Sequence, residues 1–399
     1  MICKRVCDIN PFIVMDVLEK AQEMERAGES VIHLEVGEPD FDTPEIIKEA
    51  AIEALRRGET HYTHSLGIPA LREAVCEHYA EAYGVKGLEP DRVIVTSGTS
   101  PGFLVALSTI MERGEKVVLS DPHYACYPNF IRYLGGEPVM VRVDEEDGFQ
   151  YRPEAIRKVL TPDTRAVFVN SPANPTGNLL EAERMAEIAR MGPWVLSDEI
   201  YHGLVYQGRA RSMLEFTDRC IVLNGFSKLY AMTGWRLGYL IVPEDLTRPV
   251  QKMMQNFFIS ANAAVQRAGV AALADPRVKE DVERMRRTYD ERRRFIVDGL
   301  REIGFGITVE PTGAFYVFAN ARPFTDDSYA FAFEVLEKAR VGITPGVDFG
   351  RNGQGYVRFS YANSLENIAE GLRRLKDYLH GERRSRGSGG DRPNKINEE

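Results

Sequence analysis

Residues 224–239, NGFSKLYAMTGWRLGY, decide the fold class of this chain. The run joins two apolar, strand-like stretches, Cys220 to Leu223 and Trp235 to Val242, through a turn that contains Gly and Ser. Lys228 lies in that turn among apolar neighbours, and Arg236 follows eight residues later. Burial and a second cation both lower the pKa of an ammonium group, so we predict that Lys228 is a nucleophilic amine.

From about residue 90, strand-like segments alternate with helical ones. The other strand-like segments are Val93 to Thr96, Lys116 to Ser120, Pro138 to Val143, Arg165 to Asn170 and Trp194 to Ser197. Helical segments between them include Phe103 to Arg113 and Glu181 to Met191. Several strand-like segments are apolar throughout, which suits central strands buried on both faces. The pattern predicts an α/β fold whose large domain has a mostly parallel central sheet flanked by helices.

The two ends of the chain predict a smaller α+β domain. Helical patterns cover 16–27, 70–83, 244–295, 328–340 and 365–380, and strand signals cover Gly306 to Val309, Phe315 to Ala319 and Tyr356 to Tyr361. We expect residues 1–44 to join the small domain, 45–285 to form the large domain, and 286–380 to form the small C-terminal domain. Residues 381–399 contain one apolar side chain, Ile396, apart from Gly and Pro, and we expect them to be disordered.

Composition excludes several classes of protein. A net charge of −9 argues against a general binder of nucleic acid or of anionic membranes. We find no stretch long enough to be a membrane-spanning helix, and no His or Cys cluster that supports a metal site. The five cysteines are scattered and odd in number, so we predict no disulfide framework and a cytoplasmic setting.

A phosphate site is predicted at residues 96–107, TSGTSPGFLVAL. A strand ends there, Gly98 permits a tight turn, and Pro101 stands where a helix can begin. The free N–H groups of a first helical turn bind phosphate, and Arg236 can add a bidentate contact. Taken alone the signal is weak, because many strand-to-helix turns contain Gly and Ser.

Asp198 and Tyr201 lie in WVLSDEIYHG, residues 194–203. A carboxylate at the end of an apolar strand needs a partner, and a pyridine nitrogen would serve. A carboxylate keeps such a nitrogen protonated, and a protonated pyridine ring accepts the electrons of a carbanion better than a neutral ring does. Tyr201 could place its phenol against a ring hydroxyl. The structural alternatives are a helix N-cap for Asp198 and an ordinary core position for Tyr201.

Three further motifs supply single side chains. In VFVNSPANPTGNLL, residues 167–180, two prolines force a turn, and the amide of Asn174 can donate to a ring oxygen. Tyr124, in DPHYACYP, could stack on a ring, although for this tyrosine alone ordinary packing is the favoured explanation. Arg358, in YVRFSYA, has apolar or aromatic neighbours, so it is either at an edge or aimed at an anion such as a carboxylate.

Together these motifs resemble those of the class I (fold type I) pyridoxal-phosphate-dependent aminotransferases. The phosphate turn and the runs around Asn174, Asp198 and Lys228 occur in the family's order, and the resemblance covers roughly residues 30–380. The strings AMTGWRLGY and GEPDFDTP are most similar to the prokaryotic-type, aspartate aminotransferase-like branch.

The resemblance implies pyridoxal 5'-phosphate as the cofactor and a homodimer as the assembly. It implies that Lys228 forms a Schiff base with the cofactor and moves the substrate proton, with Asp198 and Tyr201 acting on the ring. The other implied cofactor contacts are Thr99, Ser100, Tyr124, Asn174, Ser227, Arg236 and, from a neighbouring subunit, Tyr62. The implied substrate contacts are Gly37, Asn174 and Arg358, and Arg358 takes the α-carboxylate.

The implied reaction moves an amino group from an L-amino acid to a 2-oxo acid such as 2-oxoglutarate. Some aspartate-using members of the branch carry a Lys at the position of Ser100 and polar residues near the N-terminus, where this chain has Phe12 to Met15. That departure favours apolar or aromatic donors, or alanine, over aspartate. The alternatives are an aspartate aminotransferase, a β-lyase or cyclopropane-forming synthase with the same motifs, and a non-catalytic regulator.

Overall fold

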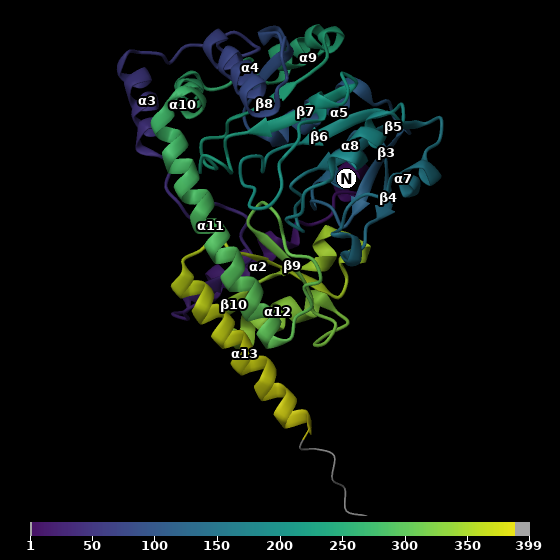
Figure 1. Ribbon diagram of the computed structural model, residues 1–399, viewed down its shortest axis with the longest axis vertical. Coiled ribbons are helices and arrows are strands. Elements are labelled where there is room, and N and C mark those ends of the chain that lie inside the picture. Colours follow the sequence, from purple (N-terminus) through teal and green to yellow (C-terminus); the bar gives the residue numbers. More distant parts are fainter. Residues whose placement is uncertain (1, 388–399) are drawn as a thin grey trace, which may run out of the picture.

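The computed structural model describes residues 2–387, and its larger part is built on one seven-stranded sheet (Figure 1). The strand order is β2-β8-β7-β6-β5-β3-β4, and the pairs are parallel except for those that β8 makes with β2 and β7. The strands are β2 Val93–Thr96, β3 Lys116–Asp121, β4 Glu137–Arg142, β5 Thr164–Asn170, β6 Trp194–Asp198, β7 Cys220–Gly225 and β8 Gly238–Ile241. The predicted α/β fold with a mostly parallel central sheet is confirmed.

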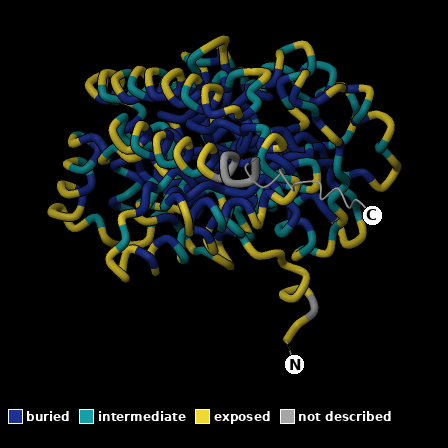
Figure 2. Tube along the Cα trace, turned by 90° about the horizontal axis from the view of Figure 1, so that it is seen from below, coloured by how far each residue is buried: buried dark blue, intermediate teal, exposed yellow. Residues whose placement is uncertain are grey.

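Helices cover both faces of this sheet, because successive strand residues point to opposite sides. Val95 and Val169 face the layer formed by α3 Glu45–Arg56, α4 Pro69–Tyr83, α7 Pro153–Val159, α8 Ala182–Ala189 and α10 Ala263–Ala274. Ile94 and Phe168 face the layer formed by α5 Thr99–Ile110, α6 Tyr127–Tyr133 and α9 Glu244–Phe257. Burial on both sides explains why the strands are apolar throughout, and Figure 2 shows the buried interior in dark blue.

The smaller part contains a three-stranded antiparallel sheet, β11-β12-β9, and a parallel pair of short strands. These strands are β1 Ile32–His33, β9 Tyr316–Asn320, β10 Val341–Gly342, β11 Thr344–Pro345 and β12 Tyr356–Ser360. Its helices are α2 Ile13–Arg26, α12 Ser328–Ala339 and α13 Leu365–Gly387. Short helices complete the chain: α1 Lys4–Cys7, η1 Pro90–Arg92, η2 Glu145–Asp147, η3 Met213–Glu215, η4 Gly346–Phe349 and η5 Arg351–Gly353.

Helix α11, Pro276–Ile303, joins the two parts (Figure 1). Val278, near its start, packs in the core of the large sheet, whereas Tyr289 and Leu300 pack in the core of the smaller part. The helix runs without a break through positions 285 and 286, where the sequence suggested a domain boundary. The domain limits given above stay a prediction.

Two expected strands differ from the structure. Of the segment Gly306 to Val309, only Gly306 pairs, through a bridge to Asn320 at the end of β9, and Val309 is exposed, so the pairing does not extend into a strand. The strand expected from Trp235 begins only at Gly238. Arg236 has a φ of 55°, which is in the left-handed region and cannot continue a strand.

Helix boundaries also shift. Helix α5 begins at Thr99, ahead of the expected Phe103, and α11 continues to Ile303, where Gly304 caps it in the left-handed region. Helix α13 continues to Gly387, so the expectation of disorder from residue 381 is wrong for residues 381–387. Glu and Arg favour helix even where apolar side chains are scarce. Residues 388–399 lie outside the described part of the chain.

No helix among the described residues is long and apolar enough to cross a membrane. The five cysteines are free thiols, with Cys220 buried and Cys3 and Cys7 exposed. The cytoplasmic location stays a prediction.

Candidate functional site

Strand ends deliver the candidate residues to one edge of the large sheet. The parallel strands β5, β6 and β7 end at Asn170, Asp198 and Gly225, and β2 ends just before Gly98. Strand β8 runs the opposite way, so it begins at this same edge, two residues after Arg236. A cavity of about 330 Å³ lies beyond the edge, as is usual for ligand sites of parallel sheets.

Almost every residue selected from the sequence lines this cavity. They are Gly37, Thr99, Ser100, Tyr124, Asn174, Asp198, Tyr201, Ser227, Lys228, Arg236 and Arg358. Tyr62 does not line it, and 83% of its surface is exposed. Its implied role needs a neighbouring subunit, so that role stays a prediction.

Lys228 is a lysine of the cavity lining whose pKa is lowered by its surroundings. Its Nζ donates to the carbonyl oxygen of Gly37 at 2.6 Å. Burial lowers the pKa of this ammonium to about 8, and the nearby Arg358 and Arg236 add to the effect, while Glu38 opposes it. The sequence predicted this shift from the same two causes, desolvation and a second cation.

Asp198 is a buried carboxylate whose described hydrogen bonds come from neutral donors. The Tyr127 hydroxyl donates to its Oδ2 at 2.5 Å, and the N–H of Ile200 donates to its Oδ1 at 3.1 Å. Burial raises the pKa of Asp198 to about 6, against these hydrogen bonds and the charge of Lys228. A cationic ring nitrogen beside Asp198 would relieve this desolvation.

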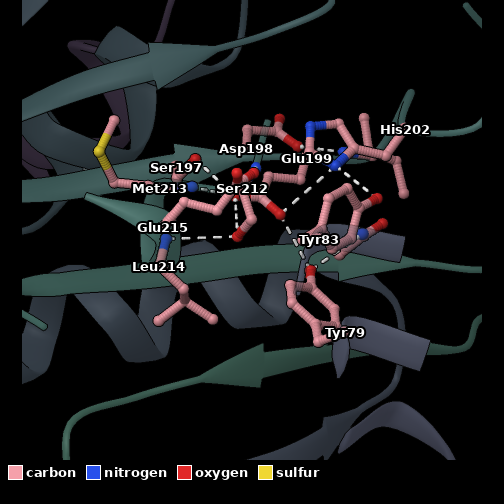
Figure 3. Close-up of polar contacts among 12 residues, drawn as sticks. Tyr79, Tyr83, Ser197, Asp198, Glu199, His202, Ser212, Met213, Leu214 and Glu215 are labelled. Atoms are coloured by element: carbon pink, nitrogen blue, oxygen red, sulfur yellow. Dashed lines mark hydrogen bonds and ion pairs between the residues drawn. The ribbon is translucent and has the colours of Figure 1, made fainter. Parts of the chain in front are cut away.

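Glu199, the next residue, does not line the cavity and belongs to a hydrogen-bond network of its own (Figure 3). Its carboxylate accepts four hydrogen bonds of 3.0 Å, from the Ser197 hydroxyl, the Ser212 hydroxyl, the Met213 N–H and the Tyr79 hydroxyl. Tyr79 in turn accepts from the side chain of Asn224 at 3.3 Å. This network fixes the end of β6, which carries Asp198, against the end of β7, which leads to Lys228.

Arg358 comes from the middle of β12 rather than from a strand end, and it is buried. Its Nη1 donates to Oδ1 of Asn174 at 2.9 Å, and its Nη2 donates to the Glu35 carbonyl at 2.6 Å and to the Thr344 hydroxyl at 3.2 Å. Its guanidinium carbon lies 4.3 Å from the centre of the Tyr316 ring. Its Nε is buried without a partner among the described residues, so the guanidinium retains capacity for a carboxylate.

The start of α5 forms an anion cradle. Gly98 precedes the helix with a φ of 88°, and no side chain caps the first turn. A Cβ on Gly238 would lie 2.9 Å from the backbone carbon of Gly98 and 3.0 Å from the Thr99 nitrogen, so only glycine fits there. Arg236 covers the same turn, because its Nη2 would lie 2.6 Å from a Cβ on Gly98. Uncapped N–H groups with an arginine suit a phosphate.

Three other selected residues, Tyr201, Tyr124 and Gly37, contact neighbouring aromatic side chains. The hydroxyls of Tyr201 and Tyr316 are 2.8 Å apart, and burial raises the pKa of the Tyr201 phenol well above its usual value. Tyr124 meets the ring of Phe12 edge to face, with centroids 6.0 Å apart. A Cβ on Gly37 would lie 2.3 Å from the Tyr316 hydroxyl, so the backbone at Gly37 approaches that side chain closely.

The sequence reasoning missed Tyr127, Asn170 and Tyr316. Asn170 is the last residue of β5, so the strand-end rule would have found it, whereas Tyr127 begins α6 and only its place in the DPHYACYP string, near Tyr124, could have indicated it. Asn170 accepts from the Asn174 N–H at 2.8 Å and fixes that turn. Tyr316 lies in β9 among apolar residues and has no local signal, because it reaches the cavity only through the pairing of β9 with β12.

These features fit pyridoxal phosphate, the cofactor that the motifs imply. The uncapped start of α5 and Arg236 suit its phosphate, Asp198 suits its ring nitrogen, and the Lys228 amine suits its carbonyl carbon. Arg358, with its spare hydrogen-bonding capacity, remains for a substrate carboxylate.

Comparison with known proteins supports this interpretation. The family model described as aminotransferase class I and II matches residues 29–375. The chain is 41% identical to a (5-formylfuran-3-yl)methyl phosphate transaminase of Methanocaldococcus jannaschii, over 95% of this chain and 100% of that protein. It is 39% identical to an aspartate aminotransferase of Pyrococcus horikoshii, over 96% of this chain and 98% of that protein.

A crystal structure from Methanococcus jannaschii, described as similar in its active site to kynurenine aminotransferases, has the same fold. It matches with a TM-score of 0.89 and 42% sequence identity, covering 95% of this chain and 100% of that one.

The anion cradle makes a testable prediction about Gly238. Replacing it with alanine should raise the Kd for pyridoxal phosphate about tenfold, because overpacking of this size costs about 1–3 kcal/mol. Absorbance titration of the apoprotein measures the Kd. The Gly234→Ala variant is the control, since no atom lies within 4 Å of a Cβ there. Equal Kd values for the two variants would contradict the cradle.

Proposed function

The chain belongs to the class I and II aminotransferases, and we propose that it moves the amino group of an apolar or aromatic L-amino acid, or of alanine, to 2-oxoglutarate. The family uses pyridoxal phosphate, and the enzyme is therefore an aminotransferase with that cofactor. The donor, the acceptor and the roles of individual residues are the proposal.

In this proposal each residue has one task. Pyridoxal phosphate, when bound, supplies a sink for the electrons left on the substrate's α-carbon when its proton departs. Arg358 binds the α-carboxylate and so orients the α-carbon. Lys228, with its lowered pKa, takes the α-proton and later returns one, which is general base and acid work near neutral pH. Asp198 keeps a proton on the ring nitrogen.

The remaining contacts hold the cofactor. We propose that Tyr201 and Asn174 donate to the ring 3-oxygen, and that Tyr124 packs against the ring face. The phosphate is assigned to the N–H groups and hydroxyls at the start of α5, from Thr99 and Ser100, with Ser227 and Arg236. The uncapped first turn of α5 supports this assignment.

The donor preference rests on one observation, the charge of the cavity lining. Among the described lining residues, the positively charged side chains are Lys228, Arg236 and Arg358, and the proposal uses all three. Where α2 covers the cavity, the lining is apolar and consists of Phe12, Val14, Met15 and Leu18. A second carboxylate, such as that of aspartate, would lose its solvation there without gaining a cation.

Aspartate remains the competing donor, because the name of the Pyrococcus relative gives that activity. The likeness of another solved relative to kynurenine aminotransferases supports an aromatic donor. For the acceptor we retain 2-oxoglutarate. Its second carboxylate would meet the same lining as that of aspartate, so pyruvate, which has no second carboxylate, is the competing acceptor.

A donor screen tests the proposal. With each acceptor in turn, phenylalanine, leucine and alanine should give kcat/KM values at least about tenfold above that of aspartate, the cost of one unmatched carboxylate. Steady-state kinetics of the holoenzyme measure the ratio. A kcat/KM for aspartate equal to or above the others would overturn the donor preference.

The Lys228→Ala variant is the control of that screen. It should lose turnover with every donor, because the base and the nucleophile are one group, while its circular dichroism stays that of the wild type. Release of ammonia and pyruvate, without any acceptor, from an amino acid that carries a β-leaving group would instead identify a β-lyase.

We also propose that the enzyme is a homodimer. Tyr62 is exposed, and its neighbour Thr63 donates from its N–H to the Ser260 hydroxyl at 3.3 Å. The loop beside Ser260 exposes two more large apolar side chains, Phe257 and Ile259. Exposed apolar residues gathered in this way mark interaction surfaces. A monomer in sedimentation equilibrium would refute the assembly.

A further inference from the structure

Arg358 is held by the backbone of a residue that carries a buried ion pair. Its Nη2 donates to the carbonyl oxygen of Glu35, and the carboxylate of Glu35 bonds His33. We propose that His33 is a positioning residue for Arg358, acting through Glu35, and that the charge of His33 sets the affinity for the α-carboxylate of both substrates. This inference rests on the carboxylate-binding role of Arg358 in the proposed function.

The Glu35 carbonyl fixes the guanidinium directly. It accepts from Nη2 of Arg358 at 2.6 Å and from the Thr344 hydroxyl at 3.1 Å. Nη2 of Arg358 also donates to that hydroxyl at 3.2 Å, so the three groups close a ring of hydrogen bonds. A shift of the backbone at Glu35 therefore moves the guanidinium of Arg358.

The Glu35 side chain has little freedom to adapt. It is fully buried, and its Oε1 lies 2.6 Å from Nδ1 of His33. Its Oε2 is buried without a partner among the described residues, and a Cβ on Gly342 would lie 2.1 Å from it. The glycine makes room for the carboxylate, and His33 supplies the cation that a buried carboxylate requires.

His33 is strongly biased to the charged form. The hydrogen bond to Glu35 raises the pKa of the imidazole to about 9, against partial burial, and Glu25 of α2 contributes through a contact of 3.2 Å to Nε2. Other elements packed against this strand also carry charged groups, and these have partners of their own. Arg374 of α13 donates to backbone carbonyls, and Arg340 pairs with Glu29.

The sign of the pH effect follows from the raised pKa. The stabilisation from the His33–Glu35 pair is complete below the unfolded value of about 6.5 and is lost as pH rises through about 9. Above that pH, Glu35 becomes a buried anion without a cation. The neutral imidazole can still donate from Nδ1, but the attraction between opposite charges is lost, so the hold of His33 on Glu35 weakens, and with it the hold of the Glu35 carbonyl on Arg358.

The direct test is the affinity of the holoenzyme for acetate, which carries only the carboxylate that Arg358 would hold. The Kd, read from the cofactor absorbance between about pH 7 and about pH 10, should rise about tenfold through pH 9 in the wild type. In His33→Gln it should already be high at the lower pH and change much less. Acetate itself has no group that titrates in this range.

Two further variants separate charge from shape. His33→Lys keeps a cation at higher pH, so it should restore the low Kd and move the rise above that of the wild type. Glu25→Gln removes only the outer, more exposed partner and should change the Kd at neutral pH by less than about twofold. Lys228 titrates in all of these proteins, so differences between them report His33.

Steady-state kinetics should separate an effect on substrate binding from an effect on catalysis. In His33→Gln the KM values for donor and acceptor should both rise while kcat stays within about twofold, as expected when ground-state and transition-state binding fall together. Identical acetate profiles for wild type and His33→Gln would overturn the inference, even if the variant has a lower Tm. An enzyme without transaminase turnover would refute the proposed function, and the acetate profiles would still decide the role of His33.

Discussion

The buried carboxylate of Asp198 is the constraint on which the site depends. It ends a strand that is covered on both faces, and its hydrogen bonds from Tyr127 and Ile200 leave it poorly compensated, with a raised pKa. A cationic ring nitrogen would satisfy this group better than a neutral donor can, because an opposite charge offsets the cost of burying the carboxylate. The network around Glu199 then matters because it fixes the strand end on which Asp198 stands (Figure 3).

The cations of the cavity complement this anion. Lys228 is desolvated and its pKa is lowered, while Arg358 is buried among neutral acceptors. Arg236 lies over an uncapped helix start. The cavity thus offers matched places for a phosphate, a cationic ring and one carboxylate. The part of the lining next to α2 is apolar, and in the proposed function it contacts the side chain of the amino donor.

Local sequence patterns predicted the features of the fold that depend on neighbouring residues alone. Two-sided burial makes the strands of the large sheet apolar throughout, and residues at or beyond their ends, such as Asp198 and Asn174, could be placed at one edge of the sheet from the sequence. Tyr316 and the His33–Glu35 pair could not be assigned, because they reach the site through β9–β12 and β1–β10 pairings between distant segments. The segment from Gly306 has strand-forming residues but makes only one bridge, to the last residue of β9, which sequence does not reveal.

The protonation of the cofactor's ring nitrogen tests the central claim most directly. The measurement is the ¹⁵N chemical shift of the protein loaded with pyridoxal phosphate labelled at that nitrogen. The account predicts a protonated nitrogen near neutral pH in the wild type and loss of that proton in Asp198→Asn, which keeps the shape but removes the charge. An unprotonated nitrogen in the wild type, or the same shift in both proteins, would contradict the role of Asp198.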